Sequence, residues 1–303
     1  MATPSEPVLL AEEENTEANT ASASRGRLVL RRFFRRKMAV VGLLVVLLLV
    51  FMAFVGPHLT QWNYTEFDVN NVYSPPSTSH WFGTNDLGQD MFARTMRGLQ
   101  KSIFIGLIGA VISTGVAGVL GAIAGYFGRA ADRSVVVLID LLLILPSFLI
   151  IAVTSPLFIG KTWLIFVILL AAFQWMLTAR VVRGLTQSLK EREFVSAARF
   201  MGVPARKIIA RHILPNMASF LIIDATVNVS SLILAEVALS YFGFGIRPPD
   251  VSLGSLSGQY ANNADTYPWL FWIPSTVLVV LVLAVNLVGD GLRDALDPNS
   301  EIG

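Results

Sequence analysis

The hydrophobic positions of this chain fall in six long blocks instead of alternating with polar positions. A helix needs roughly 20 mostly apolar residues to cross the hydrocarbon core of a bilayer. The third block is interrupted by Asp140 and Pro146, and the fifth carries Asp224 and Glu236. The pattern therefore predicts an all-α integral membrane protein with six membrane-spanning helices. The predicted spans cover residues 38–55, 102–127, 134–155, 162–179, 216–239 and 268–289.

The composition supports a membrane protein. The chain has 303 residues, of which 54% are hydrophobic and 15% charged, and its mean hydropathy is +0.62. A soluble domain carries about 25% charged residues, so this chain has too little charge to cover a water-facing surface. A net charge of +2 gives no reason to expect a nucleic-acid partner. Without cysteine there are no disulfides or thiolate metal sites, and three histidines far apart in sequence predict no metal cluster.

The basic residues are distributed unevenly between the predicted loops. With the N-terminus placed inside, the cytoplasmic segments hold 18 Lys and Arg residues and the outside segments hold 5. Cytoplasmic loops of membrane proteins carry the excess of basic residues, so both termini are predicted to be cytoplasmic. The first block follows 37 other residues and ends without a small-x-small cleavage site, which favours an anchor helix over a signal peptide.

The segments outside the blocks divide the chain into three parts. Residues 1–24 hold five Glu and no Lys or Arg, so we expect a disordered cytosolic tail. Residues 25–100 are expected to form an anchor helix and an extracytoplasmic segment, and residues 101–296 the main membrane domain. Aromatic residues in the extracytoplasmic segment predict either an interfacial belt or a small ordered cap over the pore mouth. These residues are Trp62, Tyr64, Phe67, Tyr73, Trp81 and Phe82.

The second block is rich in glycine. Gly121 and Gly125 form a small-xxx-small pair, a spacing that lets two helices approach closely in a membrane. Each glycine costs about 1 kcal/mol in a helix relative to alanine, and close backbone packing would offset that cost. We therefore expect the second span to be a tightly packed inner helix.

The sequence contains no convincing motif for ATP binding or catalysis. Residues 155–162 end in Gly-Lys-Thr but lack the first glycine of a phosphate-binding loop, and they are predicted to lie outside the cell. Gly243 and Gly245 lack the third glycine and the following helix of a dinucleotide fingerprint. No catalytic residue is assigned, and the chain is predicted not to be an enzyme. Energy for uphill transport would have to come from another chain.

The cytoplasmic segment 183–215 is too polar to lie in lipid and has a helical pattern. Glu193 lies near the start of a short helix, Gly202 is its expected end, and Pro204 suits the first turn of a second helix. A narrow apolar face at helical spacing favours a protein partner over a membrane surface. The residues of this face are Phe194, Ala197, Ala198 and Met201.

This segment resembles the E-A-A motif of ABC transporter permeases of the type I importer kind. Ser196-Ala197-Ala198 stands where the family has its E-A-A triplet, and Gly202 matches the glycine of the motif. The sequence His-Ile-Leu-Pro at 212–215 matches the end of the motif and is similar to the peptide-importer branch.

Three further blocks, 83–90, 239–249 and 286–298, resemble signatures of the peptide-importer branch. The first block departs from the branch at Asn85 and at Gln89, where a positive charge is replaced. Taken together, the four blocks resemble the C-subunit permease of oligopeptide and dipeptide importers. The resemblance covers the chain from about residue 25 onward and implies an ABC type-1 permease domain over 101–296.

The resemblance implies a multi-pass protein of a prokaryotic cytoplasmic membrane whose coupling helix, within 183–215, seats on an ATPase. The implied partners are a second permease subunit, giving a heterodimer, two ATP-binding domains and an extracytoplasmic peptide-binding protein. ATP and Mg²⁺ would be bound by those partners, and no cofactor is expected on this chain. The implied coupling residues are Glu193, Phe194, Ala197, Ala198, Met201 and Gly202.

The function that the resemblance implies is ATP-driven import of oligopeptides. Importers of dipeptides, glutathione or nickel chelates share the same blocks, so these substrates remain alternatives. A membrane-embedded enzyme or sensor is an alternative of another class. It would require catalytic or metal-binding side chains in the spans, where only three carboxylates occur, without a neighbouring histidine.

These three carboxylates, Asp140, Asp224 and Glu236, are candidate residues of a translocation pathway. A charged side chain near the middle of a membrane helix costs roughly 2.5–3.5 kcal/mol, so each should face the bundle interior or water. For Asp140 and Glu236, pairing with a polar group on a neighbouring helix is an equally good interpretation. For Asp224 the pathway is favoured, because the amino terminus of a peptide needs weak anionic contact on its way through.

Overall fold

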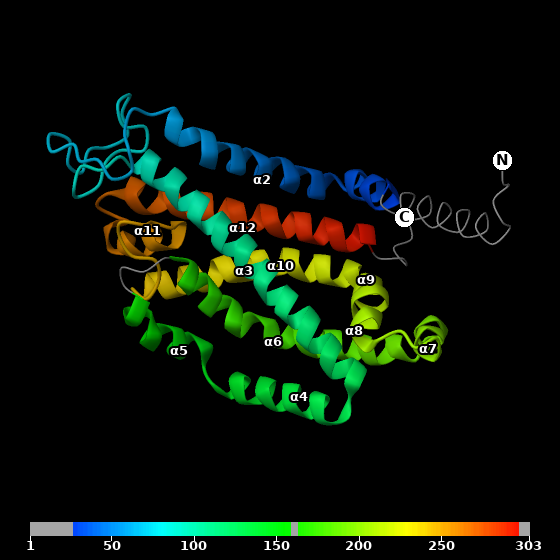
Figure 1. Ribbon diagram of the computed structural model, residues 1–303. Helices are drawn as coiled ribbons and strands as arrows, with labels where there is room; N and C mark the ends of the chain where they lie inside the picture. The colour runs from blue at the N-terminus through cyan, green and yellow to red at the C-terminus, as the bar shows by residue number, and fades with distance from the viewer. Residues whose placement is uncertain (1–26, 159–162, 297–303) are drawn as a thin grey trace, which may run out of the picture.

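The computed structural model describes residues 27–158 and 163–296, and all regular elements in these ranges are helices (Figure 1). Five of the helices are long and apolar enough to cross a membrane, and a bent pair of helices makes a sixth span if it is counted as one. The prediction of an all-α membrane protein is thus confirmed. The predicted disordered tail, residues 1–24, lies outside the described residues.

The membrane helices follow the predicted blocks, with differences at their ends. A helix over 27–35 precedes the first span. The spans are α2 (Lys37–Val55), α3 (Met91–Phe127), the pair α4 (Arg129–Ile144) and α5 (Ser147–Thr154), α6 (Trp163–Lys190), α10 (Ala218–Tyr241) and α12 (Pro268–Leu296). Shorter elements connect them: η1 (Gly56–His58), η2 (Ser155–Phe158), α7 (Glu193–Phe200), α8 (Ala205–Ile208), the π-helical turn η3 (Ile209–Ile213), α9 (Leu214–Asn216), α11 (Leu253–Gln259) and η4 (Ala261–Asn263).

Helix α3 begins eleven residues before the predicted span, at Met91 instead of Ser102. The Asp90 side chain accepts a hydrogen bond from the Ala93 backbone N–H at 2.8 Å and caps the helix. Three charged residues that precede the apolar block therefore lie inside α3: Arg94, Arg97 and Lys101. An apolar run marks where a helix crosses lipid, and a helix can continue past that limit wherever its first turn is capped.

The third span is broken in the middle. Leu145 and Pro146 are extended, and α4 and α5 meet there at an angle of 74°. Proline lacks a backbone N–H and disfavours helical geometry at the residue before it, so the helix ends at Ile144. Pro146 was visible in the sequence, but the predicted continuous span did not include the break.

The helices form a bundle in which α3 crosses between two groups (Figure 1). On one side of α3, α2 packs against α12, and on the other side α6 packs against α3 and α4. Helix α10 contacts α3, α6 and α12 near the centre. The helix over 27–35 and the end of α12 lie at the same end of the bundle as α7 and α8, in agreement with a shared cytoplasmic side (Figure 1).

Helices α3 and α6 approach most closely at the predicted glycine pair. A Cβ atom added at Gly121 would lie 2.6 Å from the backbone oxygen of Ala179. A Cβ atom at Gly125 would lie 2.6 Å from the backbone oxygen of Arg183. Both contacts are with backbone atoms of α6, which cannot move away as a flexible side chain can, so the glycines set the distance between the two helices.

Replacing Gly121 and Gly125 together by alanine is expected to destabilise the subunit by roughly 2 kcal/mol, because two methyl groups would push α6 away from α3. Gly115 is the matched control, since a Cβ atom there has nothing within 4 Å. Gly115→Ala should leave the stability unchanged or slightly higher. Thermal unfolding of the purified importer, followed by size-exclusion fluorescence, measures both. Equal melting temperatures for the two variants would contradict the packing argument.

The extracytoplasmic segment between α2 and α3 is an ordered cap, which decides between the two interpretations of its aromatic residues. The buried His80 ring contacts the carboxylates of Asp90 at 2.9 Å and Asp68 at 3.4 Å, and Trp62 stacks on it at 4.7 Å between ring centroids. The pKa of Asp68 lies below its ordinary value, chiefly because the Asn71 side chain donates a hydrogen bond to it. The extracytoplasmic cap is thus held together by a buried polar cluster beside Asp90, the residue that caps the start of α3.

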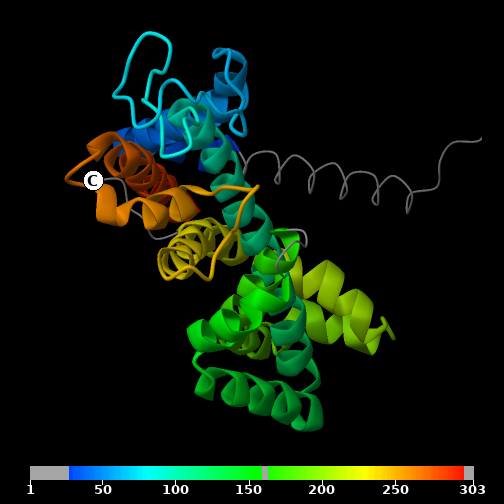
Figure 2. The ribbon, with the colours of Figure 1, turned by 90° about the vertical axis from the view of Figure 1, so that its left-hand side faces the viewer.

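The cap is attached to the membrane domain through α11 and the start of α12, as the view from the cap end shows (Figure 2). The Tyr260 hydroxyl donates a hydrogen bond to Asp86 and accepts one from Asn85, and burial raises the pKa of this hydroxyl above its usual value. Tyr73 stacks on Tyr267 with ring centroids 4.1 Å apart. Contacts between residues almost 200 positions apart in sequence therefore close the outer end of the bundle.

Candidate functional site

The cytoplasmic segment forms a corner between α7 and α8. Gly202 has φ +75°, a conformation that residues with a side chain rarely adopt. The backbone N–H of Val203 donates to the Ala198 oxygen at 3.1 Å, which closes the end of the helix. Pro204 then precedes α8. The predicted helix, glycine turn and second helix are all present.

The structure divides the predicted apolar face of α7 into two sides. Ala198 is 2% exposed and packs with Val195 on the inner side, against Val182 of α6 and the turns after α8. Phe194 and Met201 are exposed on the outer side. Ala198 therefore packs α7 against the rest of this chain, and its methyl group is not available to a partner. The prediction that Ala198 shares one exposed apolar face with Phe194 and Met201 is wrong. Glu193 and Ala197 are exposed, and Gly202 lies at the exposed turn.

The outer side of the corner carries large apolar groups in water. Phe200 is 85% exposed and Met201 is 76% exposed, at the tip of the corner. A phenylalanine and a methionine exposed side by side on a cytoplasmic loop are typical of a protein interaction site. Phe200 was not among the predicted residues, because the helical spacing placed it off the apolar face. Its signal in the sequence was its position two residues before Gly202, at the end of the predicted helix.

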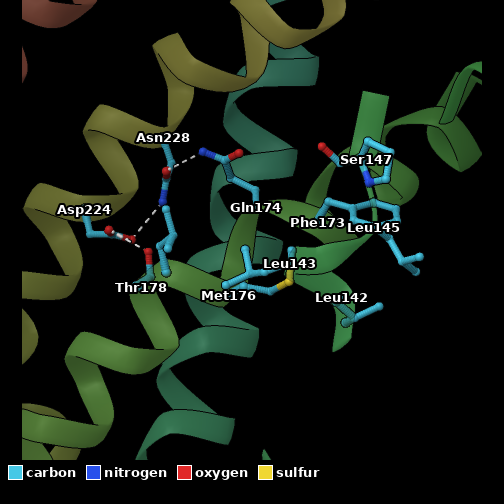
Figure 3. Close-up of a pocket in the computed structure, with 12 residues that line it drawn as sticks. Leu142, Leu143, Leu145, Ser147, Phe173, Gln174, Met176, Thr178, Asp224 and Asn228 are labelled. Atoms are coloured by element: carbon cyan, nitrogen blue, oxygen red, sulfur yellow. Dashed lines mark hydrogen bonds between the residues drawn. The ribbon is translucent and has the colours of Figure 1, made fainter. Parts of the chain in front are cut away.

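A cavity of about 400 Å³ lies where α4 breaks into α5, beside α6 and α10 (Figure 3). The break at Pro146 leaves the two helices bent apart, and the extended residues at the break line the cavity. Its wall is apolar on the α4 side, mixed on the α6 side and polar on the α10 side. The lining residues include Leu142, Leu145, Phe173, Gln174, Thr178, Asp224 and Asn228.

Asp224 is the acidic residue of this cavity. Its carboxylate accepts hydrogen bonds from the hydroxyls of Thr114 and Thr178 and from the side-chain amide of Asn228, each at 2.8 Å. Gln174 donates to the Asn228 side chain at 3.1 Å and extends the network along the wall (Figure 3). The carboxylate is thus satisfied by neighbouring side chains and also lies at a cavity, and its part in a translocation pathway stays a prediction.

The other two carboxylates lie elsewhere. Asp140 on α4 pairs with Arg180 on α6, and both side chains are about half exposed. Glu236 on α10 is completely buried and accepts hydrogen bonds from Ser240 at 2.5 Å and Ser252 at 2.6 Å. Glu236 therefore connects α10 to the start of α11 and has no access to an open path in this structure. The three predicted pathway residues are not brought together at one site.

The sequence alone did not identify the partners of Asp224. Thr114 and Thr178 come from two other helices, and their distance along the chain hides the contact. Asn228 could have been found, because it follows Asp224 by one helical turn and therefore shares its face.

The fold defines the class of protein. The solved structure entitled "Inward facing conformations of the MetNI methionine ABC transporter" matches this chain with a TM-score of 0.54 and 18% sequence identity, over 68% of this chain and 98% of that chain. The fold is therefore that of a type I ABC importer permease.

This chain belongs to the family of binding-protein-dependent transport system inner membrane components, and its residues 117–301 match the sequence pattern of that family. Residues 24–76 match the N-terminal TM domain of oligopeptide transport permease C. The oligopeptide transport system permease protein OppC of Mycobacterium tuberculosis (strain H37Rv) is 52% identical over 93% of this chain and 97% of its own length. OppC of Bacillus subtilis (strain 168) is 34% identical, over 88% and 87%. The chain is accordingly a multi-pass protein of a bacterial cytoplasmic membrane.

Proposed function

We propose that this chain is the C-type permease subunit of an importer that moves oligopeptides into the cytoplasm. The observation that carries the proposal is the 52% identity, over nearly the whole of both chains, to a protein named as an oligopeptide transport permease. The geometry fits this role, because the chain has a cap at one end, a cavity with polar and apolar walls beside α4, α6 and α10, and an exposed apolar corner at the other end.

The proposed energy source is ATP hydrolysis on partner chains. The exposed Phe200 and Met201 would insert into a groove of an ATP-binding domain, with Phe194 and Ala197 beside them. Ala198 would support this contact indirectly, by packing α7 against the bundle, and Gly202 would allow the chain to turn beside the contact. In this proposal ATP and Mg²⁺ are bound by the partners, and this chain needs no cofactor.

The proposed assembly has a second permease subunit, two ATP-binding domains and an extracytoplasmic peptide-binding protein. The exposed apolar side of α4 and α5 supports a neighbour in the membrane, since Leu141 is 58% and Val153 77% exposed beside the cavity-forming break. A second permease there would enclose the cavity between the two subunits. In that arrangement Asp224 would face the peptide, while Asp140 and Glu236 would serve packing.

The test is uptake by the complete importer, reconstituted in proteoliposomes with its binding protein and ATPases. Labelled peptides of increasing length, glutathione and a nickel–histidine chelate are offered separately. We expect ATP-dependent accumulation of peptides longer than dipeptides. Accumulation of only glutathione or only the chelate would show that this compound, and not a peptide, is the substrate. ATP hydrolysis without accumulation of any offered compound would contradict the proposal that the complex is an importer.

A further inference from the structure

The segment that leads into the first membrane helix is strongly basic. Residues 27–37 contain six Arg and Lys residues and no Asp or Glu. Arg36 pairs with Asp294 of α12 at 3.4 Å. Among the ion pairs of the described residues, none involves Arg27, Arg31 or Arg35.

The helix over 27–35 arranges these charges on one side. One face packs inward, with Phe33 only 7% exposed in a cluster with Ala39 and Ala295. Residues four apart lie on the same face of a helix. Three exposed arginines therefore form one line, which we name the arginine stripe: Arg27, Arg31 and Arg35.

An apolar pair lies between the arginine stripe and the inward face. Leu30 is 58% exposed and Phe34 is 54% exposed, and they are again four residues apart. Leu28, 51% exposed, lies on the other side of the arginine stripe, so exposed apolar residues flank the charges on both sides. A helix that rests at a membrane boundary has this arrangement, because the apolar pair enters the acyl region while the arginines reach the headgroups.

The position of the helix supports a membrane partner. It leads directly into α2, whose uncharged run begins at Met38, and it packs against the cytoplasmic end of α12. Figure 1 shows it continuing from the end of α2, at the end of the bundle where α7 and α8 lie. The arginine stripe therefore lies three to eleven residues before Met38, where the uncharged run of the first span begins.

We infer that the arginine stripe binds the phosphate groups of anionic phospholipids in the cytoplasmic leaflet, with Leu30 and Phe34 set among the acyl chains. The cytoplasmic leaflet carries negative surface charge that attracts basic segments next to a membrane helix. Guanidinium groups bind phosphate oxygens through two parallel hydrogen bonds. The inference concerns lipid binding and does not depend on which substrate the importer carries.

One other occupant has to be distinguished. Residues 1–24 hold five Glu, whose charge would also complement the arginine stripe. The exposed pair Leu30 and Phe34 favours the lipid, because a lipid supplies both an anionic group and an apolar chain at the same place.

The first experiment measures lipid retained by the intact importer. The complex is extracted from nanodiscs of phosphatidylcholine mixed with phosphatidylglycerol, and the bound lipids are counted by native mass spectrometry. We expect phosphatidylglycerol to be enriched on the wild-type complex. Changing Arg27, Arg31 and Arg35 to glutamine should reduce this enrichment roughly tenfold, since each basic residue near an anionic surface adds to the attraction.

Two control variants make the result specific. The same three positions changed to lysine should keep most of the enrichment, because the charges remain. Arg133→Gln removes one exposed cytoplasmic arginine from α4, outside the arginine stripe, and should reduce the enrichment far less than the triple variant. Any of three results would overturn the inference. The triple glutamine variant could keep the wild-type enrichment, the wild type could retain both lipids equally, or Arg133→Gln could lose as much enrichment as the triple variant.

The second experiment identifies the occupant directly. A photo-crosslinking amino acid at position 30 of the complete chain is activated in the assembled importer, in membranes that contain phosphatidylglycerol. Adducts of phospholipid mass support the inference. Adducts to peptides from residues 1–24, or to a partner subunit, would overturn it and assign the arginine stripe to that occupant.

Discussion

A Gly202→Trp variant is expected to insert and assemble but to lose about tenfold or more of its peptide uptake, the change that a loss of ~1.4 kcal/mol of docking energy produces. A Cβ atom at Gly202 has nothing within 4 Å in this chain, so a side chain there starts in open space. The indole would protrude beside Phe200 and Met201, where the ATP-binding domain is proposed to dock. Uptake in proteoliposomes, divided by the ATP hydrolysed, measures the coupling.

Gly202→Asn is the matched control for the backbone. Gly202 has φ +75°, and a left-handed residue with a side chain costs roughly 1–2 kcal/mol, less for asparagine. Gly202→Asn should therefore keep most of the uptake, while Gly202→Trp does not. If Gly202→Trp transports peptides at the wild-type rate with wild-type ATP use, the corner does not take part in coupling.

An Asp224→Asn variant is expected to change peptide uptake several-fold without loss of assembly. Asparagine keeps the shape of the side chain, and its one oxygen can accept from either the Thr114 or the Thr178 hydroxyl, which donate to different oxygens of Asp224. Its amide N–H can donate to the other hydroxyl. It removes the negative charge from the cavity wall, and with it the attraction for a peptide ammonium group. The loss should be large for peptides with a free amino terminus and small for the same peptides after N-acetylation.

Glu236→Gln is the control for Asp224→Asn. Glu236 is completely buried between Ser240 and Ser252, so its substitution should affect the melting temperature and not the preference between free and acetylated peptides. Rates for Asp224→Asn that equal wild type for both kinds of peptide would leave Asp224 as a structural carboxylate only.

The number of spans, the orientation and the cytoplasmic corner could be predicted because each depends on local sequence. Apolar block length, basic loop residues and a glycine after a short helix are all read within a few tens of residues. The start of α3 at Met91 could not be predicted from the apolar block, because the capping contact of Asp90 extends the helix through charged residues.

The environment of the candidate residues depends on tertiary packing and was harder to predict. Ala198 fits an outward or an inward face equally well by spacing, and only its packing against Val182 decides for the inward one. In the same way, Asp140 and Glu236 could be recognised as costly in a membrane. Ser240 follows Glu236 by one turn of α10, but Ser252 and the partner of Asp140 come from other elements. Asp140 pairs with Arg180, 40 residues further along the chain.

Helix α3 is continuous over 37 residues, so a tilt of the helix moves both of its ends. At 1.5 Å per residue its 37 residues extend about 56 Å, far beyond the hydrocarbon core. Tilted by about 10° around its centre, a rod of that length moves its two ends about 5 Å in opposite directions. One end begins at Asp90 under the cap, and near the other Ala122 packs in the cluster that seats Val195 and Ala198. A tilt of α3 would therefore displace the residues under the cap and the cluster around Val195 and Ala198 in opposite directions.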